Sequence, residues 1–256
     1  MTEILKGDTA LVTGAASGIG RGIATALARE GVHVVLSDVN AVSGKRVADE
    51  LAAKGAKVHY VTADLSKPDA AEKLLREAIV CLGQLTIFVH SASPKRVETQ
   101  TADAVTDDEW FAMTSVNLTA GFKLGRAAAQ HMRDQKLAGR ILFITSLHAD
   151  SPRNLPHYSA SKAGTTMVMK ELARAYGPYG IRVNALAPGA IPGGGFSADP
   201  ATLIDKIALG RVGTPEDIGN AAIALLSNRF SAYVTGTTLV VDGGLALFNW
   251  IGPPNN

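Results

Sequence analysis

The feature that most constrains the fold of this chain is a short apolar segment, followed by a glycine-rich turn and then a helical pattern. Residues 9–13 (TALVT) are predicted to form a buried strand, and the following TGAASGIG contains Gly14, Gly18 and Gly20. A helix is expected next, because apolar residues recur at helical spacing until Gly31. Glycines let the backbone turn tightly and approach a pyrophosphate, and the amides of a helix N-terminus bind anions. The segment therefore predicts the phosphate-binding part of a dinucleotide site.

The rest of the chain alternates strand-like and helix-like segments. Further strands are expected at 32–37, 57–62, 85–91, 140–146, 181–187 and 237–242. Helical patterns lie between them at 68–82, 107–134 and 158–176. Such alternation is typical of an α/β protein whose parallel sheet is covered by helices on both faces. Because no charge run or linker-like stretch interrupts the 256 residues, we expect one domain over 1–250 and a C-terminal tail over 251–256.

Charge and composition argue against several classes of function. The formal net charge is +2 with scattered lysines and arginines, so no nucleic-acid partner is expected. No apolar stretch is long enough to cross a membrane, and MTEILKGD lacks the pattern of a signal peptide. The single cysteine, Cys81, is expected to be a small buried residue, which fits a reducing cytoplasm. The six histidines show no metal-ligand spacing, so no metal is assigned.

An acidic residue follows the second predicted strand, where a dinucleotide site requires one. Asp38 comes directly after VHVVLS, at the expected distance from the glycine-rich turn. Its carboxylate would accept hydrogen bonds from the adenosine ribose of NAD and would repel the extra phosphate of NADP. An ordinary turn aspartate is the alternative. We therefore expect NAD as the cofactor, with NADP disfavoured.

Tyr158 and Lys162, in HYSASKAG, lie four residues apart and share one face of a predicted helix. A free phenol ionises near pH ~10, and a fixed positive charge nearby favours the phenolate. Such a tyrosine can take a proton from an alcohol or give one to a ketone. A half-buried tyrosine beside a solvated lysine is also common, so the pair gains its weight from the other motifs.

Taken together, TGAASGIG, YSASK, RVNALAPGAI and the closing TGTTLVVDGG resemble the short-chain dehydrogenase/reductase family over nearly the whole chain. The resemblance implies a single Rossmann-type, doubly wound α/β domain with a seven-stranded parallel sheet. It also implies hydride transfer between a nicotinamide and a small secondary alcohol or carbonyl substrate. Assembly into a homotetramer or homodimer is a further implication.

Carried over position by position, the resemblance assigns roles to individual residues. Tyr158 corresponds to the acid–base catalyst, and Lys162 to the residue that favours its ionised form and holds the nicotinamide ribose. Ser146 would hydrogen-bond the substrate oxygen, and Asn117 would hold a water molecule behind the lysine. Cofactor contacts are implied for the adenine-side residues Asp64 and Leu65, for the nicotinamide-side turn Pro188, Gly189 and Ile191, and for Gly14, Ser17, Gly18, Ile19, Gly20, Asp38, Ala92, Tyr158 and Lys162.

Three positions depart from the family pattern. The turn at 90–93 is HSAS where many members have Asn-Asn-Ala-Gly, so the side-chain support of the sheet centre must differ. Ser146 lies one residue closer to Tyr158 than is usual, and strict counting would select Thr145 instead; we prefer Ser146. Gly193 stands where a threonine commonly binds the carboxamide, which predicts a looser lid over the cofactor.

The loops that should frame the substrate are polar. They contain Lys95, Arg96, His148, Arg153, Asn154 and His157, with Leu155, Phe196 and Leu203 as large apolar residues. A sugar, polyol or sugar acid fits such a lining, and SLHADSP followed by HYSASKAG is similar to bacterial glucose dehydrogenases of the family. Solvated loop side chains are the alternative explanation.

Two other functions remain open at this point. The first is a 3-oxoacyl thioester reductase, which is disfavoured because such enzymes usually take NADP and Asp38 argues against it. The second is an NAD-binding sensor or scaffold that has lost turnover. The altered HSAS turn favours the sensor, whereas the intact Tyr158–Lys162 pair favours the enzyme.

Overall fold

A computed structural model describes residues 4–97, 99–193, 199 and 201–247 of the chain. The strands are β1 (Thr9–Thr13), β2 (His33–Asp38), β3 (Val58–Thr62), β4 (Ile87–His90), β5 (Arg140–Ile144), β6 (Arg182–Pro188) and β7 (Thr238–Val241). They form one parallel sheet in the order β3-β2-β1-β4-β5-β6-β7. The order reverses between β1 and β4, and ligands of open α/β sheets bind beside such a reversal, outside the carboxyl ends of the strands.

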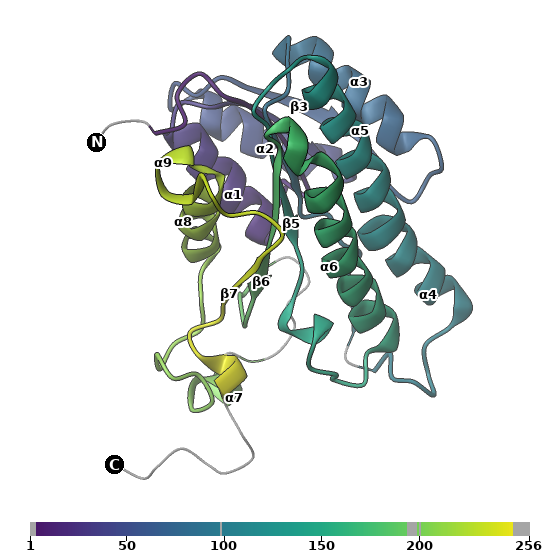
Figure 1. Cartoon of the computed structure of the whole chain (residues 1–256). Helices are drawn as coiled ribbons and strands as arrows, with labels where there is room; N and C mark the ends of the chain where they lie inside the picture. Colours follow the sequence, from purple (N-terminus) through teal and green to yellow (C-terminus); the bar gives the residue numbers. More distant parts are fainter. Residues whose placement is uncertain (1–3, 98, 194–198, 200, 248–256) are drawn as a thin grey trace.

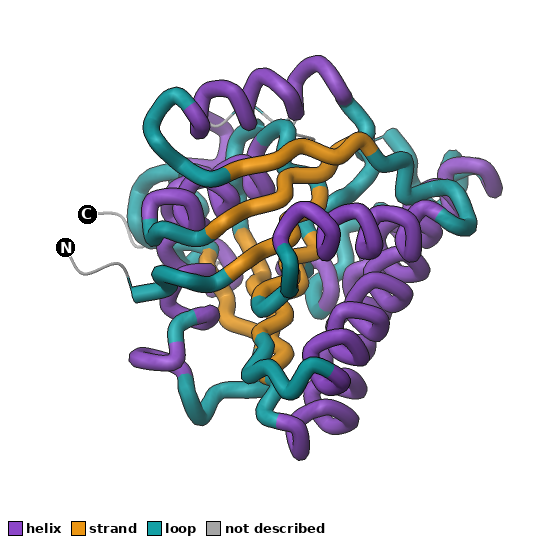
Figure 2. Tube along the Cα trace, turned by 90° about the horizontal axis from the view of Figure 1, so that it is seen from above, coloured by secondary structure: helices purple, strands orange, loops and turns teal. Residues whose placement is uncertain are grey.

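Helices cover both faces of the sheet (Figures 1 and 2). They are α1 (Gly18–Arg29), α2 (Ala41–Ala52), α3 (Ala70–Leu82), α4 (Asp107–Thr114), α5 (Gly121–Asp134), α6 (Pro156–Tyr176), α7 (Ala201–Ile204), α8 (Pro215–Leu226) and α9 (Asn228–Ser231). Side chains of α1, α2 and α8 form one apolar cluster with the sheet, and those of α3, α5 and α6 form the other. The doubly wound, seven-stranded parallel fold expected from the sequence is thereby confirmed.

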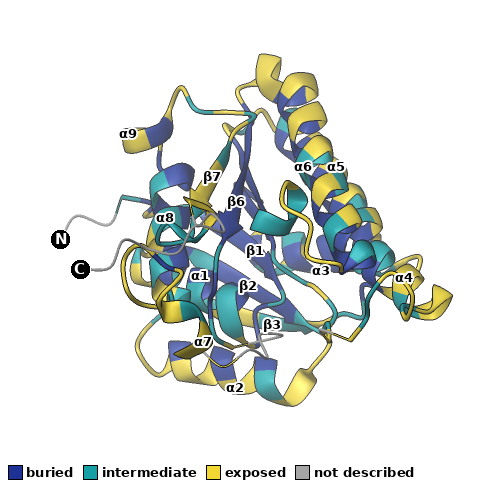
Figure 3. Ribbon diagram, turned by 90° about the horizontal axis from the view of Figure 1, so that it is seen from below, coloured by how far each residue is buried: buried dark blue, intermediate teal, exposed yellow. Residues whose placement is uncertain are grey.

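The central strands are mainly apolar because both of their faces are covered. Neighbouring residues alternate between the two clusters, so that Val12 packs on the side of α1 and Leu11 on the side of α3. Every residue of β1, β4, β5 and β6 is buried, whereas the edge strands β3 and β7 are only half-buried (Figure 3). Strands buried on both sides are uniformly hydrophobic, which is why the sequence showed continuous runs.

Most predicted boundaries agree with the structure, and a few need correction. Strand β5 ends at Ile144, so Ser146 lies beyond the strand and begins a short 3₁₀ turn instead. Strand β4 is limited to Ile87–His90 and is shorter than expected. Cys81 is half-buried on α3 rather than fully buried. The predicted tail at 251–256 lies outside the described residues.

The helix expected over 107–134 is interrupted by a π-helical turn, Ser115–Ala120, between α4 and α5. Two side chains from other elements bind backbone carbonyls of this turn. The His90 ring hydrogen-bonds the carbonyl of Val116 at 3.2 Å, and the Thr165 hydroxyl donates to that of Asn117 at 3.3 Å. Such π turns occur frequently at functional sites.

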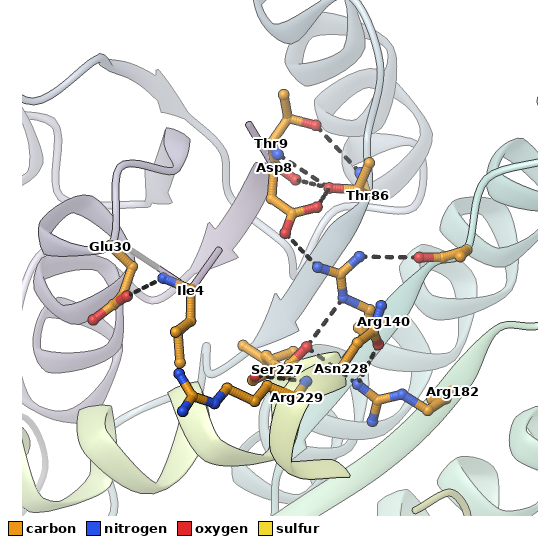
Figure 4. A network of polar contacts seen from close by, with 12 residues as sticks. Ile4, Asp8, Thr9, Glu30, Thr86, Arg140, Arg182, Ser227, Asn228 and Arg229 are labelled. Atoms are coloured by element: carbon orange, nitrogen blue, oxygen red, sulfur yellow. Dashed lines mark hydrogen bonds and ion pairs between the residues drawn. The ribbon is translucent and has the colours of Figure 1, made fainter. Parts of the chain in front are cut away.

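A polar network holds the opposite, amino-terminal edge of the sheet (Figure 4). The Arg140 side chain forms an ion pair with Asp8 and donates to the carbonyls of Leu226 and Ala138. Arg182 donates to the carbonyls of Leu225, Leu226 and Val234 and to Asn228. The network links the starts of β1, β5 and β6 to the end of α8.

Candidate active site

A cavity of about 460 Å³ opens at the carboxyl ends of β1, β2, β4, β5 and β6. Its volume lies in the range of small-molecule sites. Most of the predicted site residues line it, namely Gly14, Ser17, Gly18, Ile19, Gly20, Asp38, Ser146, Tyr158, Lys162, Pro188, Gly189 and Ile191. Asn117, Asp64, Leu65 and Ala92 do not line this cavity.

The glycine-rich turn leaves no space for side chains at two positions. Gly14 has a φ of +67°, and a Cβ there would lie 2.8 Å from the Cα of Ala92. A Cβ on Gly20 would lie 2.1 Å from the carbonyl oxygen of Gly14. The turn leads into α1, whose N-terminal residue Ser17 makes no side-chain capping bond. An uncapped helix N-terminus presents backbone N–H groups and a positive dipole to an anion.

Asp38 ends β2 and reaches towards this turn. Its carboxylate oxygens accept hydrogen bonds from the backbone amides of Ala16 at 3.1 Å and Asn40 at 2.9 Å. A carboxylate has about four lone-pair sites, so both oxygens keep the capacity to accept ribose hydroxyls. The carboxylate is thus held in the cavity wall at the place the sequence predicted.

Asp64 and Leu65 lie apart from the cavity wall. Asp64 accepts hydrogen bonds from the amide and hydroxyl of Ser66, and these bonds lower the pKa of its carboxyl group. Leu65 is buried in the apolar cluster on the side of α3. Their predicted adenine contact stays a prediction.

Tyr158 lies in the first turn of α6 and is 7% exposed. It forms a small buried apolar cluster with Met113 and Leu155. The guanidinium carbon of Arg96 lies 4.4 Å from the ring centroid, and the Nζ of Lys162 lies 5.6 Å from it. Two cations therefore lie beside the Tyr158 ring. The sequence predicted Lys162 in this position but gave no sign that Arg96 would join it.

Lys162 is buried one turn further along α6, at 4% exposure. Its ammonium donates a hydrogen bond to the carbonyl of Ile144 at 2.8 Å. Burial, together with the charge of Arg96, lowers the pKa of Lys162 to about 7. The lysine is thus poised to exchange protons near neutral pH.

Thr145 and Ser146 both line the cavity, but their hydroxyl groups differ in their hydrogen bonds. The Thr145 hydroxyl donates to the carbonyl of Leu186 at 3.0 Å and is committed to the sheet. Ser146 accepts a hydrogen bond from the amide of His148 at 3.2 Å, which leaves its own hydroxyl proton available to a substrate oxygen. This difference supports the choice of Ser146 over strict counting.

Asn117 is buried in the π-helical turn behind the cavity. Its amide nitrogen donates to the Ser161 hydroxyl at 2.9 Å, whereas its Oδ1 atom is buried without a hydrogen-bond partner among the described residues. A buried acceptor of this kind is usually satisfied by an ordered water molecule.

His90 explains how the altered HSAS turn supports the sheet centre. Its Nε2 atom donates to the Val116 carbonyl, so Nδ1 is unprotonated and accepts from the Thr13 hydroxyl at 3.1 Å. Burial lowers the pKa of His90 to about 4, and the charge of Lys162 acts in the same direction. Gly121 makes room for the ring, because a Cβ there would lie 2.9 Å from it. The neutral imidazole therefore links β1 to the turn that carries Asn117.

The polar loops only partly behave as predicted. Lys95, Arg96, His148, Arg153 and Leu203 line the cavity, but Asn154, His157 and Leu155 do not. Leu155 and His157 are buried. The side-chain oxygen of Asn154 accepts a hydrogen bond from the amide of Ala102, in the loop before α4. Gly193, at a φ of +109°, lies against Gly18. Phe196 lies outside the described residues.

No group of three or more His, Cys, Asp and Glu side chains among the described residues is arranged to hold a metal ion. No helix in the described part of the chain is both long and apolar enough to cross a membrane.

Several proteins to which the chain is similar are dehydrogenases or reductases. The protein-family model described as "Enoyl-(Acyl carrier protein) reductase" matches residues 14–246. The chain is 38% identical to 3beta-hydroxysteroid dehydrogenase 1 of Eggerthella lenta, covering 97% of both chains. It is 36% identical to glucose 1-dehydrogenase 2 of Bacillus subtilis, covering 97% of this chain and 98% of the relative. A short-chain type dehydrogenase/reductase from Mycobacterium marinum superposes with a TM-score of 0.88 at 33% identity, covering 95% of this chain and 97% of the other.

Proposed function

Since the chain belongs to the short-chain dehydrogenase/reductase family, and is therefore an oxidoreductase acting on CH–OH groups with NAD or NADP, we propose that it is an NAD-preferring dehydrogenase of a secondary hydroxyl. The substrate class that we propose is a sugar, polyol or sugar acid. The observation that carries the proposal is the grouping of Tyr158, Lys162 and Ser146 in the wall of the cavity that the glycine-rich turn also forms.

The residues present fit a dinucleotide. The turn at Gly14 and Gly20 is closed to side chains, and the N-terminus of α1 carries no side-chain cap. Asp38 keeps acceptor capacity for a ribose. Pro188, Gly189 and Ile191 form the wall beside Lys162, where the nicotinamide half would lie. When bound, the nicotinamide supplies the acceptor for the hydride of the carbinol carbon.

The chain's own residues handle the proton and the substrate oxygen. Ser146 donates a hydrogen bond to that oxygen and orients it towards Tyr158. The Tyr158 oxygen, in its ionised form, accepts the hydroxyl proton of the alcohol. The charged groups of Lys162 and Arg96 lie beside the Tyr158 ring. We propose that Lys162 then releases its own proton towards a water molecule, which the buried Oδ1 of Asn117 supports, and takes up the proton of Tyr158 in its place.

The cofactor preference can be tested at Asp38. Replacing Asp38 with alanine removes the negative charge that would repel the extra phosphate of NADP. The ratio of kcat/KM for NAD to that for NADP should fall at least about tenfold, which corresponds to about 1.4 kcal/mol. Asp49→Ala, an exposed aspartate on α2, is the matched control. An unchanged ratio in Asp38→Ala would remove the support for NAD.

The substrate class is tested by following reduced nicotinamide absorbance over a panel of alcohols. The panel contains sugars, polyols, sugar acids, a 3β-hydroxysteroid and 3-hydroxyacyl thioesters, each with NAD and with NADP. The polar side chains that line the cavity support the hydroxylated substrates, and the glucose 1-dehydrogenase among the relatives points the same way. Turnover confined to the steroid or the thioesters would refute this part of the proposal. Tight NAD binding without any turnover would favour a sensor.

We also propose assembly into a homotetramer or homodimer and a reducing, cytoplasmic compartment. Apolar side chains of Phe111, Phe122 and Met167 are exposed on α4, α5 and α6, which supports a covered face in the assembly. The single cysteine supports the compartment. Light scattering should give two or four times the chain mass of 26.6 kDa, and the mass of one chain would contradict the assembly.

A further inference from the structure

Arg96 lies beside Tyr158 on the substrate side of the cavity, and the structure gives it no ion-pair partner among the described residues. We propose that Arg96 binds an anionic group of the substrate, a carboxylate or a phosphate, close to the carbon that is oxidised. The inference rests on the proposed dehydrogenase function. It narrows the substrate from neutral sugars and polyols to acids or phosphate esters.

The first argument is how Arg96 is held. Its guanidinium lies over the face of the Tyr158 ring, with 4.4 Å between the guanidinium carbon and the ring centroid. Stacking on an aromatic ring fixes a guanidinium in place without using its N–H groups. The Nε atom is buried without a hydrogen-bond partner in the described part of the chain. A buried donor of a charged group is costly to leave unpaired, so the site is built to be completed by an acceptor.

The second argument is the charge of the cavity wall. Lys95 and Arg153 also line the substrate side, together with His148. Among the described lining residues the acidic one is Asp38, which is held at the glycine-rich turn by the amides of Ala16 and Asn40. The potential around the substrate is therefore positive, which favours an anion.

The third argument concerns the neighbouring titratable groups. Glu109 on α4 acts on the neighbouring His157, but its carboxylate caps its own helix by accepting from Thr106, and it also accepts from Gln100. These bonds lower the pKa of Glu109 and leave the carboxylate committed. The pKa of His157 is lowered, mainly by burial. The charge of Glu109 opposes this shift, and the charge of Arg96 adds to it. Both ring nitrogens of His157 are buried without a hydrogen-bond partner in the described part of the chain, so His157 does not pair with Arg96.

The position of Arg96 limits where the anion can sit on the substrate. Because the hydroxyl that reacts must meet the Tyr158 oxygen, an anion bound by the stacked guanidinium belongs to a nearby carbon. An α- or β-hydroxy acid satisfies this geometry, as does the phosphate ester of a small polyol. The planar guanidinium can donate two parallel hydrogen bonds to two oxygens of a carboxylate or phosphate. A neutral hydroxyl has one oxygen and cannot accept this pair of bonds.

The test compares matched charged and neutral alcohols in the wild type and in Arg96→Gln. The pairs are β-hydroxybutyrate and butan-2-ol, gluconate and sorbitol, and glycerol phosphate and glycerol, each with NAD. We expect the wild type to prefer a charged member. In Arg96→Gln, kcat/KM for that member should fall about tenfold to a hundredfold more than kcat/KM for its neutral partner. The carboxylate and phosphate pairs identify which anion is bound.

Arg76→Gln is the matched control, since Arg76 is an exposed arginine on α3 outside the cavity wall. An equal loss on charged and neutral members would show that Arg96 serves only the Tyr158 ring and would overturn the inference. The absence of a charge preference in the wild type would overturn it as well.

A binding measurement keeps the two proposals separate. Calorimetry with the NADH-bound protein measures the affinity for malonate and for inorganic phosphate without any turnover. One of these anions should bind about tenfold or more weakly to Arg96→Gln than to the wild type and to Arg76→Gln. Equal binding in all three proteins would overturn the inference. If NAD binds and no alcohol of the wider panel reacts, the dehydrogenase function fails whatever the anion result.

Discussion

The amino-terminal and carboxyl edges of the sheet, where its strands begin and end, hold buried positive charge in opposite ways. At the amino-terminal edge, the guanidinium of Arg140 is paired with Asp8, and that of Arg182 is surrounded by backbone carbonyls (Figure 4). At the carboxyl edge, Lys162 has one carbonyl partner, and Arg96 rests on an aromatic ring. No described carboxylate forms an ion pair with either of these two cations.

The pKa values follow the same division. Burial lowers the pKa of Arg182 to about 10, with Arg140 adding to the effect, so the group remains a cation at neutral pH. Burial lowers the pKa of Lys162 to about 7, where the proton can leave. A satisfied cation stabilises the fold, whereas an unsatisfied one is kept available for a ligand or a proton. The contrast predicts that substitutions at the amino-terminal edge lower stability, whereas substitutions at the carboxyl edge lower catalytic activity.

The largest expected effect is the loss of catalysis in Tyr158→Phe. Removing the hydroxyl removes the proton acceptor, so kcat/KM should fall by about a hundredfold to ten-thousandfold. The affinity for NAD and the thermal midpoint should remain close to those of the wild type. Tyr176→Phe, at the other end of α6, is the control that should keep full activity. Full activity in Tyr158→Phe would refute the acid–base role.

The amino-terminal edge is tested by Asp8→Ala, which leaves the buried charge of Arg140 without its partner. The free energy of unfolding should fall by about 3–5 kcal/mol, as measured by urea denaturation. KM for NAD should not change. Lys45→Ala removes an exposed ion pair with Asp49, and it should cost less than about 1 kcal/mol. Similar losses of unfolding free energy in the two variants would mean that the buried ion pair at the amino-terminal edge stabilises the fold no more than an exposed one.

His90, at the carboxyl end of β4, is a third buried group that can titrate. The pKa of His90 falls from an ordinary 6.5 to about 4 on burial. Above pH 6.5 the ring is neutral in the folded and unfolded chain, so its contribution to stability is then fully present. As the pH falls towards 4, the unfolded chain binds a proton that the folded chain does not. The free energy of unfolding should thereby fall by up to about 3 kcal/mol.

Urea unfolding at pH values on both sides of this window checks the His90 effect. The difference in stability between His90→Asn and the wild type should shrink as the pH is lowered, because the variant lacks the titrating ring. His59→Asn, an exposed histidine on β3, should track the wild type across the window. A constant difference between His90→Asn and the wild type would show that the ring does not titrate as proposed.

The smallest expected effect is a shift of the pH profile in Arg96→Gln. The charge of Arg96 lowers the pKa of Lys162, so its removal raises that pKa. The rise of kcat/KM for a neutral alcohol should then move to higher pH, by about one unit or less. The apparent value belongs to the Tyr158–Lys162 pair rather than to either group alone. A shift to lower pH would contradict the placement of Arg96.

Where the structure departs from the sequence-based predictions, contacts between distant elements are the cause. The helix predicted over 107–134 has a continuous helical pattern, but its π-helical turn depends on His90 from β4 and Thr165 from α6. Similarly, Ser146 and Thr145 are equivalent by composition, and only the bond from Thr145 to Leu186 on β6 separates their roles.

Local sequence was sufficient for the sheet, the glycine-rich turn, Asp38 and the Tyr158–Lys162 pair, because each depends on neighbours within one strand–turn–helix unit. Tertiary structure alone decided that Arg96 stacks on Tyr158, that His90 joins β1 to the turn of Asn117, and that Leu155 and His157 face the core. Hydrophobic periodicity and glycine spacing are properties of consecutive residues. The partner of a loop arginine or a buried histidine is set by how separate elements pack, and no local pattern records it.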